Sequence, residues 1–165
     1  MKIVVLSDTH ISKPEFHIPS RLIEELKTAE KIIHAGDWQT IEVHEKLSTY
    51  APVEGVYGNV DGEGIKKCMP EKKSIQVNGF SIGIVHGHGE KKTTIHRAIE
   101  AFSKEDVDCI IFGHSHIPHL QYYKKTLLFN PGSATQKRKL PYFSFGVLTI
   151  TEEIKAEHIF YSTKE

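Results

Sequence analysis

Short apolar runs that end in polar, glycine-containing turns recur along the first part of the chain. These runs, each with the turn that follows it, are residues 2–6 before Ser7-Asp8-Thr9-His10, residues 31–34 before Ala35-Gly36-Asp37, and residues 52–56 before Gly58-Asn59. Such runs are typical of buried parallel strands that lead into loops. Residues 18–30 and 40–50 lie between them and carry apolar side chains at helical spacing. The pattern predicts a βαβαβ unit with a mostly parallel sheet.

Hairpins replace this pattern after the charged stretch of residues 63–73. Residues 74–77 and 80–85 are joined by Asn78-Gly79, which supplies the positive φ angles of a type I′ turn. Residues 93–104 have one apolar helical face, and residues 109–112 form a buried run before Gly113-His114-Ser115-His116. Further strands are predicted at residues 120–123, 126–129, 142–150 and 154–161. We therefore expect two sheets packed face to face, with helices outside.

Composition limits the class of protein. A chain of 165 residues that is 39% hydrophobic fits one globular domain, residues 1–165. Lys+Arg and Asp+Glu both number 21, and a net charge of zero argues against a nucleic-acid or anionic-membrane binder. No apolar run approaches the roughly 20 residues that cross a bilayer. Two cysteines and the absence of a signal-like start favour a reduced, cytoplasmic protein.

Residues able to bind metals stand at the ends of five predicted strands. They are Asp8 with His10, Asp37, Asn59, His86, and His114 with His116. The carboxyl ends of strands in open α/β sheets converge on one crevice, so these side chains can meet although they are distant in sequence. Any single pair is weak evidence, because Asp and Asn are common in loops. The combination predicts a metal site.

The ligand types indicate which chemistry this site supports. Imidazole together with carboxylate suits manganese, iron, cobalt, nickel or zinc, whereas calcium and magnesium prefer nearly all-oxygen sites. In two-metal sites the ions lie about 3.5–4 Å apart and need a bridging carboxylate, for which Asp37 is the candidate. Such a pair produces a metal-bound hydroxide near neutral pH and clamps phosphate oxygens. The sequence therefore predicts a phosphoesterase that needs no Ser or Cys nucleophile.

In their order along the chain, these motifs resemble those of the calcineurin-like metallophosphoesterase superfamily, over nearly the whole sequence. Asn130-Pro131-Gly132-Ser133 and the closing strands are most similar to its small YfcE-like phosphodiesterase branch. The resemblance implies an α/β fold built as a four-layer α/β/β/α sandwich, a small phosphate-ester substrate and two divalent transition-metal ions, with manganese as the first expectation. It is also compatible with a homodimer. The implied ligands are Asp8, His10 and His116 for one ion, Asn59, His86 and His114 for the other, and Asp37 between them.

One motif departs from the family pattern. Many members have Gly-Asn-His-Glu, whose histidine is placed to protonate the leaving group, but this chain has Gly58-Asn59-Val60-Asp61. Val60 has no proton to donate, and general-acid help is typically worth ~10²–10⁴ in rate. We expect either a substrate with a good leaving group or a substitute donor such as His88. Together with two of the implied metal ligands, Asn59 and His10, His88 makes up the set of candidate catalytic residues.

Other conspicuous residues have simpler interpretations. His34 reads as a buried structural histidine. Asp61 suits either the orientation of a ligand or an ordinary turn, and Trp38 suits either a pocket wall or the core. The run 137–139 reads as a solvated basic loop, of which only Arg138 is a candidate to contact a substrate phosphate.

Three functions stay open at this stage. The leading interpretation is a phosphodiesterase, with phosphomonoesters as the second substrate class. A binding scaffold on the same fold is the main alternative, since a relative in the retromer complex looks like this domain and works through protein contacts. A nuclease would ordinarily carry a basic groove, which the neutral composition does not favour. The complete ligand set favours the enzyme, because a scaffold has no chemical need for all of it.

Overall fold

The computed structural model describes residues 1–165 and contains two five-stranded sheets. The first sheet has the order β10-β9-β1-β2-β3. Its strands are β1 (Lys2–Leu6), β2 (Lys31–His34), β3 (Val53–Gly55), β9 (Phe143–Ile150) and β10 (Ile154–Tyr161). The strands β1, β2 and β3 pair in parallel, and the β9–β10 hairpin joins β1 in the antiparallel sense. The predicted βαβαβ unit is therefore confirmed.

The second sheet combines a parallel centre with antiparallel edges, in the order β4-β5-β6-β8-β7. Its strands are β4 (Lys72–Val77), β5 (Phe80–Val85), β6 (Cys109–Ile111), β7 (His119–Tyr123) and β8 (Thr126–Asn130). The turn between β4 and β5 has φ angles of 49° at Asn78 and 85° at Gly79. These positive values confirm the hairpin predicted from the Asn-Gly pair.

The helices are α1 (Ser20–Leu26), α2 (Ile41–Ser48), α3 (Glu63–Cys68) and α4 (Thr94–Ala101). Three of them lie within the predicted helical segments, but α1 is shorter than residues 18–30, since it begins after Pro19 and ends at Leu26. Helix α3 was not predicted. Only Ile65 is buried in it, and a single buried position leaves no apolar periodicity to detect. No helix of the chain combines the length and the apolar character that crossing a membrane requires.

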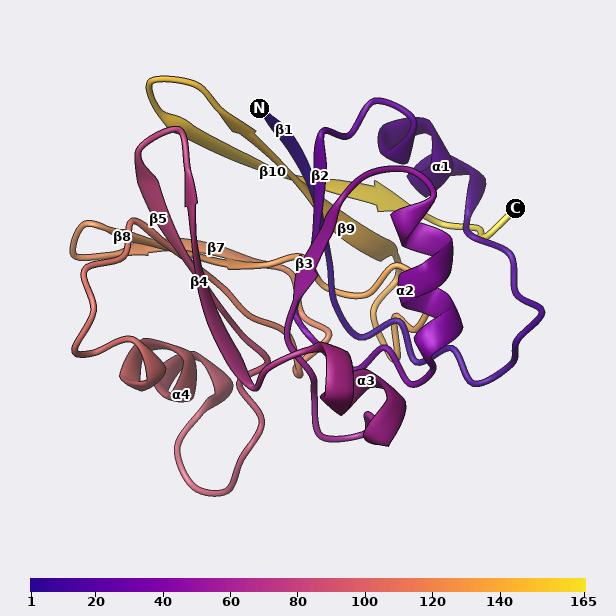
Figure 1. Ribbon diagram of the computed structural model, residues 1–165, viewed down its shortest axis with the longest axis horizontal. Helices are drawn as coiled ribbons and strands as arrows, with labels where there is room; N and C mark the ends of the chain where they lie inside the picture. The colour runs from indigo at the N-terminus through magenta and orange to yellow at the C-terminus, as the bar shows by residue number, and fades with distance from the viewer.

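Three apolar clusters join these elements into four layers. Between the sheets, Val5 and Ile33 of the first sheet share a cluster with Ile84 of the second. On the outer face of the first sheet, α1 and α2 pack through buried residues such as Leu26 and Val43. Helix α4 packs on the outer face of the second sheet in a further cluster. Figure 1 shows α1 and α2 beside the first sheet and α4 beside the second. The expected α/β/β/α sandwich is confirmed.

The topology brings several loops to one end of the two sheets. Because β1, β2 and β3 are parallel, the loops that follow them leave from the same edge, and the loops after β5 and β6 do the same in the second sheet. Backbone hydrogen bonds join neighbouring loops at this edge: Asp8 N–H donates to Gly36 O at 2.9 Å, and Gly113 N–H to His86 O at 3.1 Å. Residues far apart in sequence therefore meet there.

Candidate metal centre

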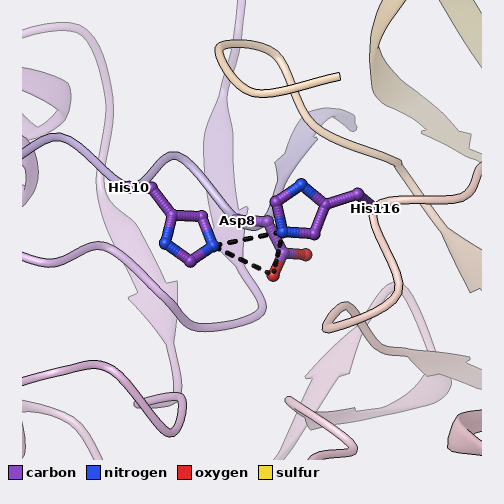
Figure 2. Close-up of side chains that lie close together, drawn as sticks. All are labelled: Asp8, His10 and His116. Carbon is purple, nitrogen blue, oxygen red and sulfur yellow. Dashed lines mark hydrogen bonds and ion pairs between the residues drawn. The ribbon is translucent and has the colours of Figure 1, made fainter. Parts of the chain in front are cut away.

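Asp8, His10 and His116 form the first group of candidate ligands. Figure 2 shows their side chains pointing toward one another from the loops after β1 and β6. The Asp8 Oδ1 atom lies 3.8 Å from His10 Nε2 and 3.5 Å from His116 Nε2, and the two Nε2 atoms are 3.2 Å apart. Ligand atoms that each lie about 2.0–2.2 Å from one ion are separated by roughly 3–3.5 Å. The spacing suits a cation held between these three side chains.

Asp37, His86 and His114 form the second group, with one ligand atom from each within 4.8 Å of the others. The His86 Nε2 atom lies 3.2 Å from Asp37 Oδ2. Asn59 joins this group at its solvent side, where its Oδ1 atom lies 3.1 Å from His114 Nδ1. The four residues come from the loops after β2, β3, β5 and β6, so four of the five predicted strand ends supply one residue each.

Asp37 connects the two groups. Its Oδ2 atom lies 3.4 Å from His10 Nε2 and 3.2 Å from His86 Nε2, so one oxygen faces a histidine of each group. The Asp8 Oδ1 atom is also 3.9 Å from His86 Nε2. The structure thus brings all seven predicted ligands into one site, and the position of Asp37 suits a bridge.

Unpartnered buried atoms test whether a metal fits. Asp8 Oδ1 and His86 Nε2 are buried without a hydrogen-bond partner, an arrangement that costs free energy unless another group binds them. The remaining polar atoms of these side chains are occupied: Asp8 Oδ2 accepts from Ser7 Oγ at 2.7 Å, and His86 Nδ1 donates to Ala35 O at 2.7 Å. A histidine that donates through Nδ1 presents the lone pair of Nε2 to a metal. The residues therefore fit divalent metal ions.

Two carboxylates, those of Asp8 and Asp37, make the centre of the site negatively charged. Burial raises the pKa of Asp37, but the neighbouring His86 and the Val60 N–H group outweigh burial and hold this pKa at about 2. Burial lowers the pKa of His86, yet Asp37 and Asp8 reverse the effect and raise it. Burial also lowers the pKa of His114 and His116, which favours the neutral form that binds metals. Two close carboxylates thus provide the negative charge that a divalent ion neutralises.

The backbone at the ligands adopts a conformation that most residues avoid. Positive φ angles of 54°, 47°, 58°, 67° and 61° occur at Asp8, His10, Asp37, His114 and His116, respectively. Positive φ costs on the order of 1–3 kcal/mol at a residue with a side chain and concentrates at functional sites. In the loops Asp8–His10 and His114–His116, the two ligands flank a residue whose φ angle is not positive. The backbone therefore turns twice and aims both side chains inward.

Two glycines allow the loops to approach one another closely. A Cβ atom at Gly58 would lie 2.1 Å from Asp37 Oδ1, and one at Gly113 would lie 1.8 Å from Ser7 Oγ. Both distances are far below van der Waals contact, so any side chain would displace a candidate ligand or its support. Close backbone approach is therefore the reason for glycine at these positions.

Asp61 fixes the loops that carry Asp37 and Asn59. It is buried, and its carboxylate accepts hydrogen bonds from the backbone N–H groups of Asp37 at 2.9 Å, Gly58 at 2.8 Å and Gln39 at 2.7 Å. Burial raises the pKa of Asp61 although these donors act in the opposite direction. Of the two roles left open by the sequence, orientation of the ligand loops is the one observed.

The segment between β8 and β9 supports the first group, and no sequence pattern predicted this support. Ser133 Oγ donates to Asp8 O at 2.7 Å, and Thr135 Oγ1 donates to Thr9 O at 2.5 Å. His116 Nδ1 donates to Gln136 O at 2.6 Å. These bonds join residues more than 100 positions apart except for the last pair, so only the fold reveals them.

The remaining singled-out residues fall outside the two groups. His88 is half-buried, and its ring centroid lies 5.5 Å from that of His86. Its Nδ1 atom is buried without a partner. Trp38 is a core residue and no pocket wall: it is fully buried, stacks on His34 at 3.7 Å and donates to Val56 O at 2.8 Å. His34 is buried and structural, as the sequence predicted.

Residues 1–153 match the calcineurin-like phosphoesterase superfamily domain. The chain belongs to this superfamily. A probable metallophosphoesterase from Methanocaldococcus jannaschii is 32% identical to it over 160 residues, which are 96% of this chain and 81% of the relative. A phosphodiesterase from the same organism is 28% identical over 145 residues, 80% of this chain and 83% of that protein. The crystal structure of an Entamoeba histolytica Vps29 variant is 25% identical, with a TM-score of 0.76 over 98% of this chain and 99% of that one.

Membership of the calcineurin-like phosphoesterase superfamily confirms the resemblance inferred from the strand-end motifs. It agrees with the two clustered groups of metal-binding side chains, because metallophosphoesterases work with divalent metal ions. The family and the site thus agree on metal-dependent phosphoester chemistry.

Proposed function

We propose that this phosphoesterase is a phosphodiesterase that holds two divalent transition-metal ions. Asp8, His10 and His116 would hold one ion, Asn59, His86 and His114 the other, and Asp37 would contact both. The observation that carries the proposal is the Asp37 Oδ2 atom, which lies 3.4 Å from a histidine of the first group and 3.2 Å from one of the second. The phosphodiesterase among its relatives favours diesters as the substrate class.

When bound, the ions would lower the pKa of a water to near neutrality, supplying hydroxide for in-line attack, and would offset the charge of the phosphate. The protein supplies the orientation. His10 and Asn59 lie at the more accessible side of the two groups, where Asn59 is exposed and its Oδ1 atom faces His114. The Asn59 amide can therefore donate a hydrogen bond to a phosphate oxygen at the mouth of the site.

His88 is the proposed proton donor to the leaving group. Val60, which stands where many relatives have histidine, is 43% exposed and has no proton to give. The ring of His88 lies beside the second group, with its centroid 6.5 Å from that of His114. A His88→Ala variant should lose activity toward diesters with poor leaving groups and retain more of it toward nitrophenyl diesters. Full activity on poor leaving groups would remove His88 from the mechanism.

The alternative functions are a protein-binding scaffold, suggested by the likeness to Vps29, and a phosphomonoesterase or nuclease. Zero net charge gives a nuclease no general electrostatic attraction for its substrate. Manganese as the bound metal, a cytoplasmic location and a homodimer stay predictions from the sequence.

A hydrolysis panel with added metals tests the proposal. Purified protein is supplied separately with manganese, nickel, iron, cobalt or zinc and assayed on aryl diesters, aryl monoesters and cyclic nucleotides, with Asp37→Ala as the matched control. We expect the fastest turnover on diesters and close to two metal ions per chain by elemental analysis. The Asp37→Ala variant should lose both the turnover and the bound metal. If no metal gives turnover above that of Asp37→Ala on any substrate, the scaffold is the better interpretation.

A further inference from the structure

A hollow of about 430 Å³ opens beside the first group of candidate ligands. His116 forms part of its wall, together with Ile117, Leu140 and the basic run of residues 137–139. Since His116 also faces Asp8 and His10, the hollow and the metal centre share this residue as a common wall. A substrate whose phosphate lies at the centre therefore has room for one of its ester groups here.

The inner walls of this hollow are apolar. Ile117 is 55% exposed, which is high for a large aliphatic side chain next to a polar site. Lys137 turns its ammonium group away, because Nζ donates to Pro141 O at 2.9 Å and lies 5.2 Å from the centre of the Phe143 ring. The hydrocarbon stem of a lysine held in this way adds to the apolar surface. An apolar or aromatic group would replace water at these walls favourably.

The rim of the hollow carries cations without partners. Arg138 and Lys139 are exposed and form no ion pair with a carboxylate. Arg138 also has a φ angle of 54°, in the region that residues with side chains rarely adopt. Ser133 and Thr135, a few residues earlier in the same loop, are hydrogen-bonded to the loop of the first group. An unpaired cation at the rim of an apolar wall complements an anion.

We propose that this hollow binds one ester group of the substrate, an aromatic or aliphatic group that carries an anion at its far end. Ile117 and Leu140 would contact its body, and Arg138 would pair with its carboxylate or phosphate. The inference rests on the proposed phosphodiesterase function and specifies its substrate class.

The positions of His88 and the hollow beside different ligand groups decide which ester group enters the hollow. His88, the proposed proton donor, lies beside the second group, whereas the hollow adjoins His116 of the first. The leaving group must reach the donor, so the group in the hollow is the one that remains on phosphorus. Substrate preference should therefore depend on that group when the leaving group is kept constant.

Three diesters with the same 4-nitrophenyl leaving group test this. Their second groups are methyl, phenyl and 4-carboxyphenyl, and kcat/KM is measured with the metal that supports the highest activity. The wild type should prefer phenyl over methyl and 4-carboxyphenyl over phenyl. Ile117→Ser should reduce the preference for phenyl over methyl about fivefold, because apolar contact is lost. Arg138→Gln should reduce the preference for 4-carboxyphenyl over phenyl about fivefold, because an ion pair at the rim is lost. Lys125→Gln, an exposed cation on the β7–β8 turn, is the control and should alter neither ratio.

The outcomes separate the two proposals. Hydrolysis of the diesters with ratios that Ile117→Ser and Arg138→Gln leave unchanged would overturn the hollow as a binding site and keep the phosphodiesterase. A loss of the 4-carboxyphenyl preference in Lys125→Gln as large as in Arg138→Gln would also overturn it, because the effect would then come from total charge. Absence of turnover on all three diesters with every metal would instead refute the phosphodiesterase function itself.

Discussion

The two groups of candidate ligands differ in how far they lie from solvent. In the first group Asp8 is 0% and His116 2% exposed, and only His10 reaches the surface. In the second group Asp37 and His86 are buried, but His114 is half-buried and Asn59 is exposed. Water can therefore replace a lost ligand easily in the second, open group and poorly in the first, closed group. We infer that the first group holds its ion tightly and that the second exchanges its ion and meets the substrate.

The supports of the two groups differ as well. A buried carboxylate, that of Asp61, holds the loops of the second group through three backbone N–H groups. From the segment between β8 and β9, the first group is held by neutral hydroxyl groups, those of Ser133 and Thr135. Hydrogen bonds to a charged group contribute about 1.5–3 kcal/mol and neutral ones about 1 kcal/mol. Asp61 should therefore contribute more to stability than either of these hydroxyl groups.

Removal of a ligand from the closed group should have the largest effect. His116→Ala leaves Asp8 and His10 alone around the first ion, and this ion should be lost. Because a catalytic ion contributes several kcal/mol to the transition state, kcat/KM should fall by at least about 10³-fold. Elemental analysis should find about one ion fewer per chain. His96→Ala, an exposed histidine on α4, is the control. A variant that keeps its metal content and a tenth of its activity would contradict the assignment.

Removal of the exposed ligand should cost less. In Asn59→Ala water can take the place of the amide oxygen, so the second ion should bind more weakly without being excluded. We expect a decrease of roughly 10–100-fold in kcat/KM at limiting metal, partly restored when the metal concentration is raised. A titration of activity against metal concentration measures this. Equal losses in Asn59→Ala and His116→Ala would show that the two groups do not differ as inferred.

Loss of the charged support should affect stability more than chemistry. In Asp61→Asn an NH₂ group faces one of the backbone N–H donors, so at least one of them loses its acceptor. The free energy of unfolding should fall by about 2 kcal/mol, measured by urea denaturation. Asp106→Asn, at an exposed position without a hydrogen-bond partner, should leave it within about 0.5 kcal/mol. A stable Asp61→Asn protein would show that the three donors find other acceptors.

Loss of the neutral support should have the smallest effect. Ser133→Ala removes the bond from Ser133 Oγ to Asp8 O and the acceptor of the Gln136 N–H group, and should lower the free energy of unfolding by about 1–1.5 kcal/mol. Denaturation under the same conditions as for Asp61→Asn allows direct comparison. A loss as large as that of Asp61→Asn would mean that charge does not distinguish the supports of the two groups.

Local signals explain which parts of this fold could be predicted. The β4–β5 hairpin depends on the Asn78-Gly79 pair, whose backbone preference acts without the rest of the chain. Helix α3 has one buried residue, Ile65, and its position depends on tertiary contact instead of periodicity. The seven candidate ligands were found because parallel strands end at a common edge. The roles of Asp61 and Trp38 stayed open until their neighbours were known.

The sequence by itself determined the strands, the donor types at their ends and the family to which they belong. Apolar runs and turn residues are properties of neighbouring positions, so they can be read along the chain. Tertiary structure alone decided that Asp37 faces both groups, that Ser133 supports Asp8 from a position 125 residues away, and that a hollow adjoins His116. These features depend on how separate elements pack, and no local pattern encodes the distance between side chains that only packing brings together.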